Sequence, residues 1–356
     1  MSLNYSIKDW EIDKPANFNS AYWSEATNTI FVARKDDEAI TIEGYHEDTS
    51  LHTHSVLLDY KLSSKILDLK YFAEENLFCI CSGSSVALFD KEGHTVLEYQ
   101  REEGILSAQY GSAGVIYLEL YEYSGNRSLG VWNTKSNTVS RYELESWNHY
   151  NRAFKINSTS EILFGTCNAY ECGLNIHVLN FENEKLRYIN QPGLFCHRDE
   201  IECYALSINS FGDEYAMIVD YYNGRDAPLL CYYSIYSQGQ AIKEITLPEQ
   251  RGTDVNYNAT YFLYDKYILL ESKNSLTIID PRTSHGEHKF EHIEKDENSF
   301  LAVNNLRGKF VFKQKNRLRI CELHEIVLID EKRITTMQEF LKDIQAGKYS
   351  TVQVEE

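Results

Sequence analysis

The chain has 356 residues, of which 43% are hydrophobic, enough for a large buried core in one or two domains. Its 53 acidic and 35 basic residues give a formal net charge of -18, and this field disfavours general binding to nucleic-acid phosphates. No apolar run approaches the roughly 18 residues of a membrane span, and the start MSLNYSIKDWEIDK lacks a secretory pattern. We therefore expect a soluble, cytoplasmic protein that binds neither nucleic acid nor membranes.

Short segments rich in β-branched and aromatic residues follow one another along the chain, separated by Gly, Asn, Asp and Ser clusters. Seven of them align as one kind of strand, with starts 42 to 56 residues apart. They are AITIEG (39–44), VALFDKEG (86–93), LGVWNTKS (129–136), NIHVLNFEN (175–183), CYYSIYSQG (231–239), LTIIDPRT (276–283) and LRICELHE (318–325). This spacing is typical of four-stranded propeller blades. We predict an all-β, seven-bladed β-propeller over residues 1–333.

One repeat shows the expected blade in full. YALSI (204–208) is its first strand (a), YAMIVDY (215–221) the second (b), LLCYYSI (229–235) the third (c) and AIKEITL (241–247) the outer strand (d). A blade cannot bury both faces alone, so blades stack around a central axis. One or two β-sandwiches are the alternative architecture. Either residues 3–10 or residues 325–331 supply the last outer strand.

The turn INSFGDEYAM (208–217) resembles the hydrophobic-Ser-Pro-Asp-Gly-x-hydrophobic turn of WD40-like and TolB-like propellers. VALFDKEG, LGVWNTKSN and LTIIDPRT resemble the strand that ends in Trp-Asp in those proteins, although Trp-Asp itself is absent from this chain. As a pattern, the resemblance covers most of the chain. It implies membership of the propeller superfamily without specifying a family.

The C-terminal segment, residues 334–356, differs from the repeats. Residues 334–350 place five apolar side chains on one helical face, with Thr336 and Glu339 at capping-box spacing and Gly347 as a C-cap. The apolar residues are Ile334, Met337, Phe340, Leu341 and Ile344. We predict a short amphipathic helix that packs on the propeller, with docking into a partner as the alternative.

Motifs for catalysis are missing from the sequence. It has no nucleophile elbow, P-loop, dinucleotide-binding or H-E-x-x-H pattern, and GSSV (83–86) and GSAG (111–114) read as turns. The eight cysteines form no C-x-x-C pair, so we expect reduced core thiols, with Cys79 and Cys81 filling a blade interface. We predict no cofactor. The alternative is a propeller enzyme, or a small-ligand or metal-binding protein, with its site in the central channel.

Two groups of histidines in the sequence are candidate metal ligands. His52 and His54 have the i, i+2 spacing that places two ligands on one strand face, and the second group is His285, His288 and His292. No cysteine lies near either group, and the context of the first looks like a loop. We interpret both as surface histidines and predict no metal site.

The two faces of the predicted ring differ in loop length. In blades 3 to 5 the loops between strands b and c, and those that lead from strand d to strand a of the next blade, are long. Both kinds emerge on one face of blades 3 to 6, called here the long-loop face. The turns between a and b and between c and d are short and emerge on the opposite, short-turn face. The six long loops are residues 121–128, 146–152, 168–173, 191–200, 221–228 and 248–258.

These loops contain five arginines, seven tyrosines and Trp147 but no lysine, although the chain has 21 lysines. Arg, Tyr and Trp are enriched in binding hot spots, where planar groups lose little entropy. We predict a non-catalytic protein-interaction module that binds a peptide or protein segment bearing carboxylate or phosphate groups. The alternative is that the arginines pair with acids in the same loops. The candidate residues are Tyr121, Tyr123, Arg127, Trp147, His149, Tyr150, Arg152, Tyr170, His197, Arg198, Tyr221, Tyr222, Arg225, Arg251 and Tyr257.

Overall fold

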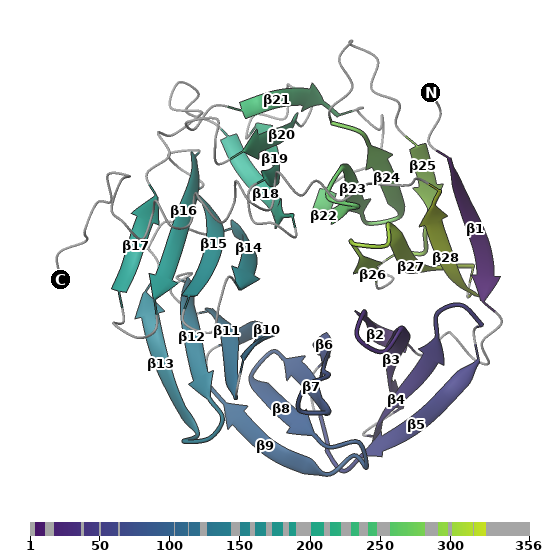
Figure 1. The fold of residues 1–356 in the computed structure, drawn as a ribbon, viewed down its shortest axis with the longest axis vertical. Coiled ribbons are helices and arrows are strands. Elements are labelled where there is room, and N and C mark those ends of the chain that lie inside the picture. The colour runs from purple at the N-terminus through teal and green to yellow at the C-terminus, as the bar shows by residue number, and fades with distance from the viewer. Residues whose placement is uncertain are drawn as a thin grey trace.

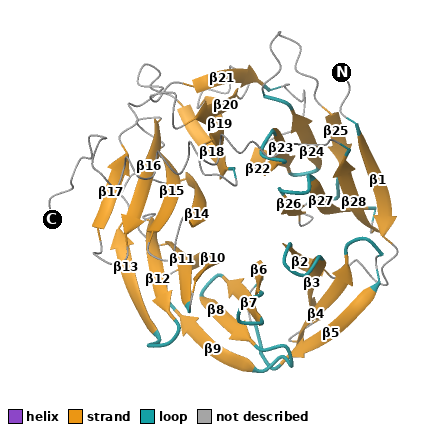
Figure 2. Ribbon diagram, viewed as in Figure 1, coloured by secondary structure: helices purple, strands orange, loops and turns teal. Residues whose placement is uncertain are grey.

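The computed structural model contains seven four-stranded antiparallel sheets in the part of the chain it describes. Every regular element in these ranges is a β-strand (Figure 2), so none is a helix able to cross a membrane. The described residues are 4–10, 18–36, 39–49, 51–62, 65–102, 104–112, 114–121, 127–143, 150–156, 161–168, 173–180, 185–189, 201–209, 214–221, 229–234, 241–247, 257–281, 291–297, 301–315 and 317–324.

Each sheet is one blade, and its strands are paired in chain order. Blade 1 comprises β2 (Phe18–Ser24), β3 (Thr29–Asp36), β4 (Ala39–His46) and β5 (His52–Leu58). Blade 2 comprises β6 (Ile66–Phe72), β7 (Leu77–Ser82), β8 (Ser85–Phe89) and β9 (Thr95–Gln100). Blade 3 comprises β10 (Gly104–Ser112), β11 (Val115–Tyr121), β12 (Arg127–Asn133) and β13 (Thr138–Glu143).

The next three blades repeat this order. Blade 4 comprises β14 (Tyr150–Ile156), β15 (Glu161–Asn168), β16 (Gly173–Asn180) and β17 (Lys185–Ile189). Blade 5 comprises β18 (Ile201–Ile208), β19 (Glu214–Tyr221), β20 (Leu229–Ser234) and β21 (Ala241–Thr246). Blade 6 comprises β22 (Tyr257–Leu263), β23 (Tyr267–Ser272), β24 (Ser275–Ile279) and β25 (Glu291–Glu294).

Blade 7 joins the two ends of the described chain. Its strands are β26 (Leu301–Asn304), β27 (Lys309–Gln314), β28 (Arg317–Leu323) and, as the outer strand, β1 (Tyr5–Trp10). β1 pairs with β28 antiparallel from Tyr5↔Leu323 to Trp10↔Leu318. Asp9 adds ion pairs to Arg317 and Arg319, at 3.0 and 2.7 Å. Of the two predicted closing segments, the N-terminal one supplies this strand, while residues 325–331 lie outside the described part.

The sheets form a ring around a central opening, with the first strand of each blade innermost and the fourth at the rim (Figure 1). The core lies between neighbouring blades. In β3, Phe31 and Ala33 pack in a cluster shared with blade 2, whereas Ile30 and Val32 pack in one shared with blade 7. Because side chains alternate along a strand, a blade between two others needs apolar residues on both faces. The continuous burial of β8 follows from this arrangement.

The predicted all-β propeller is confirmed, and each of the seven aligned segments contributes to the third strand of one sheet. Blade 5 also has its four strands where they were expected, in β18 to β21. The predicted helix after residue 334 lies outside the described residues. The division into residues 1–333 and 334–356 therefore stays a prediction.

Candidate functional site

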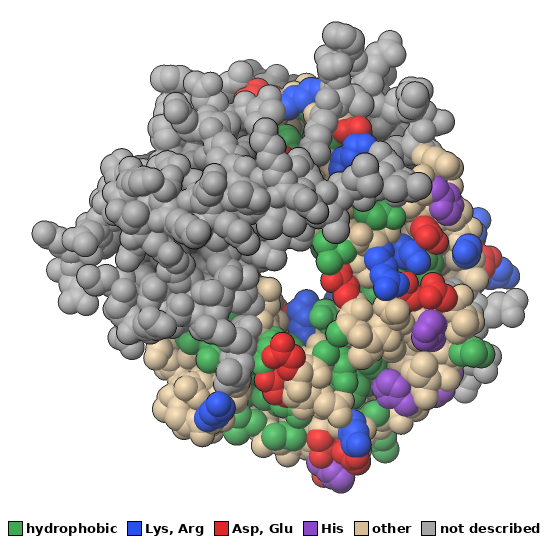
Figure 3. Space-filling model, in the orientation of Figure 1, with side chains coloured by type: hydrophobic (Ala, Val, Ile, Leu, Met, Phe, Trp, Pro, Cys, Tyr) green, Lys and Arg blue, Asp and Glu red, His purple; other side chains and the backbone are tan. Residues whose placement is uncertain are grey.

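The innermost strands of blades 1, 2, 6 and 7 line a cavity of about 530 Å³ at the centre of the ring. The space-filling view shows the hollow there (Figure 3). Its lining includes Ser20 near the start of β2, Lys65 just before β6, and Glu271 near the end of β23. Starts of a strands and ends of b strands lie at the long-loop face, so these three residues extend the lining to that face. Its volume lies within the usual range of ligand sites.

Charged and aromatic side chains meet where β2 and β6 adjoin. Lys70 Nζ lies 3.2 Å from Asp68 Oδ1 and 5.4 Å from the centroid of the Tyr22 ring, a cation–π geometry. The side chain of Lys70 remains 34% exposed and that of Asp68 19% exposed. Burial raises the pKa of the Asp68 carboxyl, and the ammonium of Lys70 opposes this rise. Lys70 thus presents an ammonium group to the cavity.

The carboxylate of a second acid in the lining, Glu271, is bound by a tyrosine and a buried lysine. Tyr261 donates its hydroxyl hydrogen to Glu271 Oε2 at 3.1 Å, and Lys295 Nζ lies 3.3 Å from Oε1. The Lys295 side chain is only 1% exposed and also donates to the Lys273 carbonyl at 3.2 Å. Burial raises the pKa of Glu271, whereas the charge of Lys295 lowers it. Both carboxylates among the described lining residues therefore have a lysine partner.

A further cavity of about 640 Å³ lies toward the short-turn face. It shares Tyr22, Asp68 and Lys70 with the first cavity and continues along β10, where Ser107 donates to Glu119 Oε2 at 3.1 Å. The Asp68–Lys70 pair therefore lies between the two halves of the channel and faces both.

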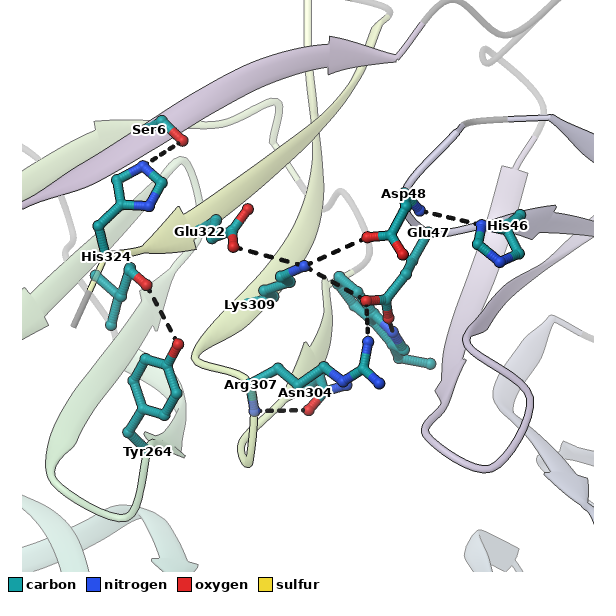
Figure 4. A network of polar contacts seen from close by, with 12 residues as sticks. Ser6, His46, Glu47, Asp48, Tyr264, Asn304, Arg307, Lys309, Glu322 and His324 are labelled. Carbon is teal, nitrogen blue, oxygen red and sulfur yellow. Dashed lines mark hydrogen bonds and ion pairs between the residues drawn. The ribbon is translucent and has the colours of Figure 1, made fainter. Parts of the chain in front are cut away.

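A separate polar network joins blades 7 and 1 at the short-turn face (Figure 4). Its centre is Glu47, whose side chain is fully buried and accepts a hydrogen bond from Trp23 Nε1 at 2.8 Å. Arg307 Nη1 donates to the same carboxylate, and Lys309 Nζ lies 3.4 Å from it. Lys309 also lies 3.6 Å from Glu322. Since Arg307 and Lys309 of blade 7 both pair with the buried Glu47 of blade 1, we assign this network to ring closure.

Six of the fifteen candidate binding residues lie in described strands, and their backbones share one end of the blades. Tyr121 ends β11, and its cross-strand partner Arg127 begins β12. Tyr221 ends β19, and Tyr257 begins β22. These positions, and those of Tyr150 and Arg152 in β14, are ends of b strands or starts of a and c strands, on the long-loop face.

The observed strand bounds correct the predicted loop bounds, because these six residues belong to strands. The β-ladders extend further into the predicted loops than the polar composition of those segments indicated. The other candidates lie outside the described residues, so the structure does not test whether the set forms one surface. They are Tyr123, Trp147, His149, Tyr170, His197, Arg198, Tyr222, Arg225 and Arg251.

Other expectations about reactive residues have clear outcomes. Cys79 and Cys81 are free, buried and packed between blades 2 and 3, as predicted. His52 and His54 lie in the strand β5, so the expected loop context was wrong. In the described ranges no group of three or more His, Cys, Asp and Glu side chains is arranged to hold a metal ion.

Sequence reasoning missed the channel residues. The available signal was Asp68 and Lys70 alternating with leucine in ILDLKYF, a strand that the blade period places innermost. Charged residues at i, i+2 share one side of an innermost strand, where an apolar blade interface would otherwise be expected. Tyr261 and Glu271 of blade 6 line the same cavity as residues of blades 1 and 2 because the blades form a closed ring.

No family model and no curated protein matches the chain. Among solved structures, it is similar to the β-propeller domain of Cps50 (Swd1) from Myceliophteria thermophila, with 13% identity, TM-score 0.61, and coverage of 89% of this chain and 100% of that one. It is similar to the Pan2 WD40 domain of Neurospora crassa, with 7% identity, TM-score 0.56, and coverage of 92% and 98%. A streptogramin B lyase has 14% identity, TM-score 0.59, and coverage of 90% and 98%.

These similarities establish the fold alone, because proteins of different function share one fold at such low sequence identity. The chain has a WD40-like β-propeller fold, as the resemblance in its turns and third strands predicted.

Proposed function

We propose that this propeller is a non-catalytic protein-interaction module whose long-loop face, over blades 3 to 6, binds a peptide or protein segment. The segment carries carboxylate or phosphate groups, which arginines hold by paired hydrogen bonds while tyrosines stack against the chain. The observation that carries the proposal is the set of long connections rich in Arg and Tyr and free of Lys. WD40 domains among the similar structures are consistent with it.

The strand ends support a common location for the set. Tyr121 and Arg127 are cross-strand partners at the base of one long connection, and Tyr221 begins another two blades further on. Residues at the bases of neighbouring loops on one face can contact one extended ligand. Planar side chains at such positions contribute more binding energy than their share of the area.

Charge reversal of two arginines tests the proposal. Arg127→Glu combined with Arg225→Glu should leave folding nearly intact, since exposed substitutions usually change stability by within about 0.5 kcal/mol. It should abolish capture of the native partner, because losing a hot-spot arginine costs about 2 kcal/mol or more. Partner capture from a lysate of the source cells is measured by quantitative mass spectrometry, beside urea unfolding of each variant.

The matched control is Lys135→Glu combined with Lys185→Glu, two charge reversals at the short c–d turns of blades 3 and 4. This control should bind as the wild type does. Normal binding by the arginine variant, with loss in the lysine variant, would place the interaction on the other face. Unfolding of the arginine variant would instead assign those arginines a structural role.

A second candidate function is supported by the channel cavity of about 530 Å³ and its charged lining. In this case the propeller binds a small ligand or metal, or acts as an enzyme, at the central channel. Native mass spectrometry of the purified protein tests it. A stoichiometric bound metal or small molecule favours this function, and a bare polypeptide mass counts against it.

A further inference from the structure

We propose that the long-loop half of the central channel binds a carboxylate group through Lys70 and Lys65. The proposal rests on the second candidate function, for which it names the ligand class, and it is independent of the long-loop binding surface.

The charges around the cavity favour an anion. Its described residues include Lys65 and Lys70 against Asp68 and Glu271, and Lys295 lies directly behind Glu271. Among the described residues, two ammonium groups and two carboxylates therefore line the cavity, and the buried ammonium group of Lys295 adds a third positive charge behind Glu271. This surplus of one positive charge occurs in a chain whose formal net charge is -18. A ligand with one negative charge balances the cavity.

The geometry shows which cations remain available. Lys295 is buried and occupied by Glu271 and a backbone carbonyl. Lys70 has one ion-pair partner in the described part of the chain, Asp68, and an ammonium group has three hydrogens to donate. Lys65 is exposed at the mouth and has no ion-pair partner among the described residues. Lys70 and Lys65 are therefore the two donors that a ligand meets.

Other ligand classes fit less well. A cation would face two carboxylates that already have lysine partners, and an apolar molecule would leave those charged groups without water. A phosphate monoester carries about two negative charges at neutral pH, more than this cavity compensates. Phosphate sites also commonly use arginine forks, and no arginine is among the described lining residues.

Calorimetric titration of the full-length protein tests the proposal with two carboxylate sources. N-acetylglycine represents a free small carboxylate. The blocked tripeptide acetyl-Gly-Glu-Gly-amide represents an acidic side chain of a polypeptide. The uncharged comparators are N-acetylglycinamide and the same tripeptide with Gln. We expect saturable binding of at least one carboxylate and none of its uncharged comparator, and the one that binds identifies the source.

Substitutions assign the site. Lys70→Met should raise the Kd at least tenfold, since a hydrogen bond to a charged group commonly accounts for that factor or more. Lys65→Met should raise it severalfold. Asp68→Asn should lower the Kd, because it removes the internal competitor for Lys70. Lys91→Met is the control: its side chain is 66% exposed on the turn between β8 and β9, and binding should not change.

Loss of Lys70 alone leaves Asp68 without its partner and could unfold the blade. The double variant Asp68→Asn, Lys70→Met removes both charges and should fold and still fail to bind. Absence of binding to both carboxylates, equal binding of inorganic phosphate, or full binding by the double variant overturns the proposal. A bound metal or other ligand in native mass spectrometry, with no carboxylate binding, would preserve the channel function while overturning this inference.

Discussion

Blades 6, 7, 1 and 2 differ from blades 3, 4 and 5 in how their second and third strands are joined. In the first group the b–c connections are the two-residue segments 273–274, 315–316, 37–38 and 83–84. In the second group they are the longer segments 122–126, 169–172 and 222–228. A two-residue hairpin offers at most two loop side chains to a ligand. Closing a longer connection has a larger entropic cost, and long loops in compact domains are often functional.

In the blades with two-residue b–c connections, ion pairs stabilise the fold. Arg307 pairs with buried Glu47, and Arg317 and Arg319 both pair with Asp9. Hydrogen bonds from Arg319 and Arg317 hold the pKa of Asp9 below its usual value. These arginines have internal partners, which is the alternative interpretation of those in the long loops. Three predictions test how far the two groups of blades differ.

The largest effect is expected where the ring closes. Glu47→Ala should lower the free energy of unfolding by about 3–5 kcal/mol, because it leaves Arg307, Lys309 and the Trp23 indole without their buried acceptor. Urea unfolding followed by tryptophan fluorescence measures it. The adjacent Asp48→Ala removes a side chain that is 60% exposed and should change stability by within about 0.5 kcal/mol. Equal effects of the two would contradict the role assigned to burial.

Loop insertion should give an intermediate effect. Ser82 Oγ donates to the Ser85 carbonyl at 3.3 Å across the short hairpin, and the Gly83 and Ser84 carbonyls accept from Ile105 N and Arg101 N. Inserting Gly-Gly between Gly83 and Ser84 disrupts these bonds and should cost about 1–3 kcal/mol.

The matched insertion lies between Asn223 and Gly224, in the seven-residue connection of blade 5. Lengthening a loop that is already long costs little closure entropy, so less than about 1 kcal/mol is expected. Thermal and urea unfolding of both variants measure the difference. If the blade 5 insertion were the more damaging, the long connections would be structural parts of the propeller.

The smallest effect is a pH dependence in blade 1. Burial, with a smaller contribution from His52, lowers the pKa of His54, whose ring lies 5.4 Å from that of Phe31. The unfolded chain then takes up a proton at about pH 6.5, above the pKa of the folded state. Stability should therefore fall as the pH drops below that value. His54→Gln should show a shallower fall in urea midpoint between pH 7 and 5, and an unchanged slope would contradict this assignment.

Sequence patterns could predict the blades because their information is local. VALF and LTII are recognised as third strands from alternation and from the turn that follows. The bounds of the long loops were less predictable. By composition Tyr121 and Arg127 look like loop residues, yet they are cross-strand partners at the end of the β11–β12 ladder. The channel site was missed because its residues come from blades that are far apart in sequence.

The sequence by itself determined the fold class, the repeat period, the third strand of each sheet and the placement of Cys79 and Cys81 in a blade interface. Only the tertiary structure decided that β1 completes blade 7, that Arg307 meets Glu47 across 260 positions, and that Asp68, Lys70 and Glu271 line one cavity. The reason is physical. Strand and turn formation depends on neighbours within a few residues, whereas these contacts exist only after seven twisted sheets have packed face to face and closed a ring.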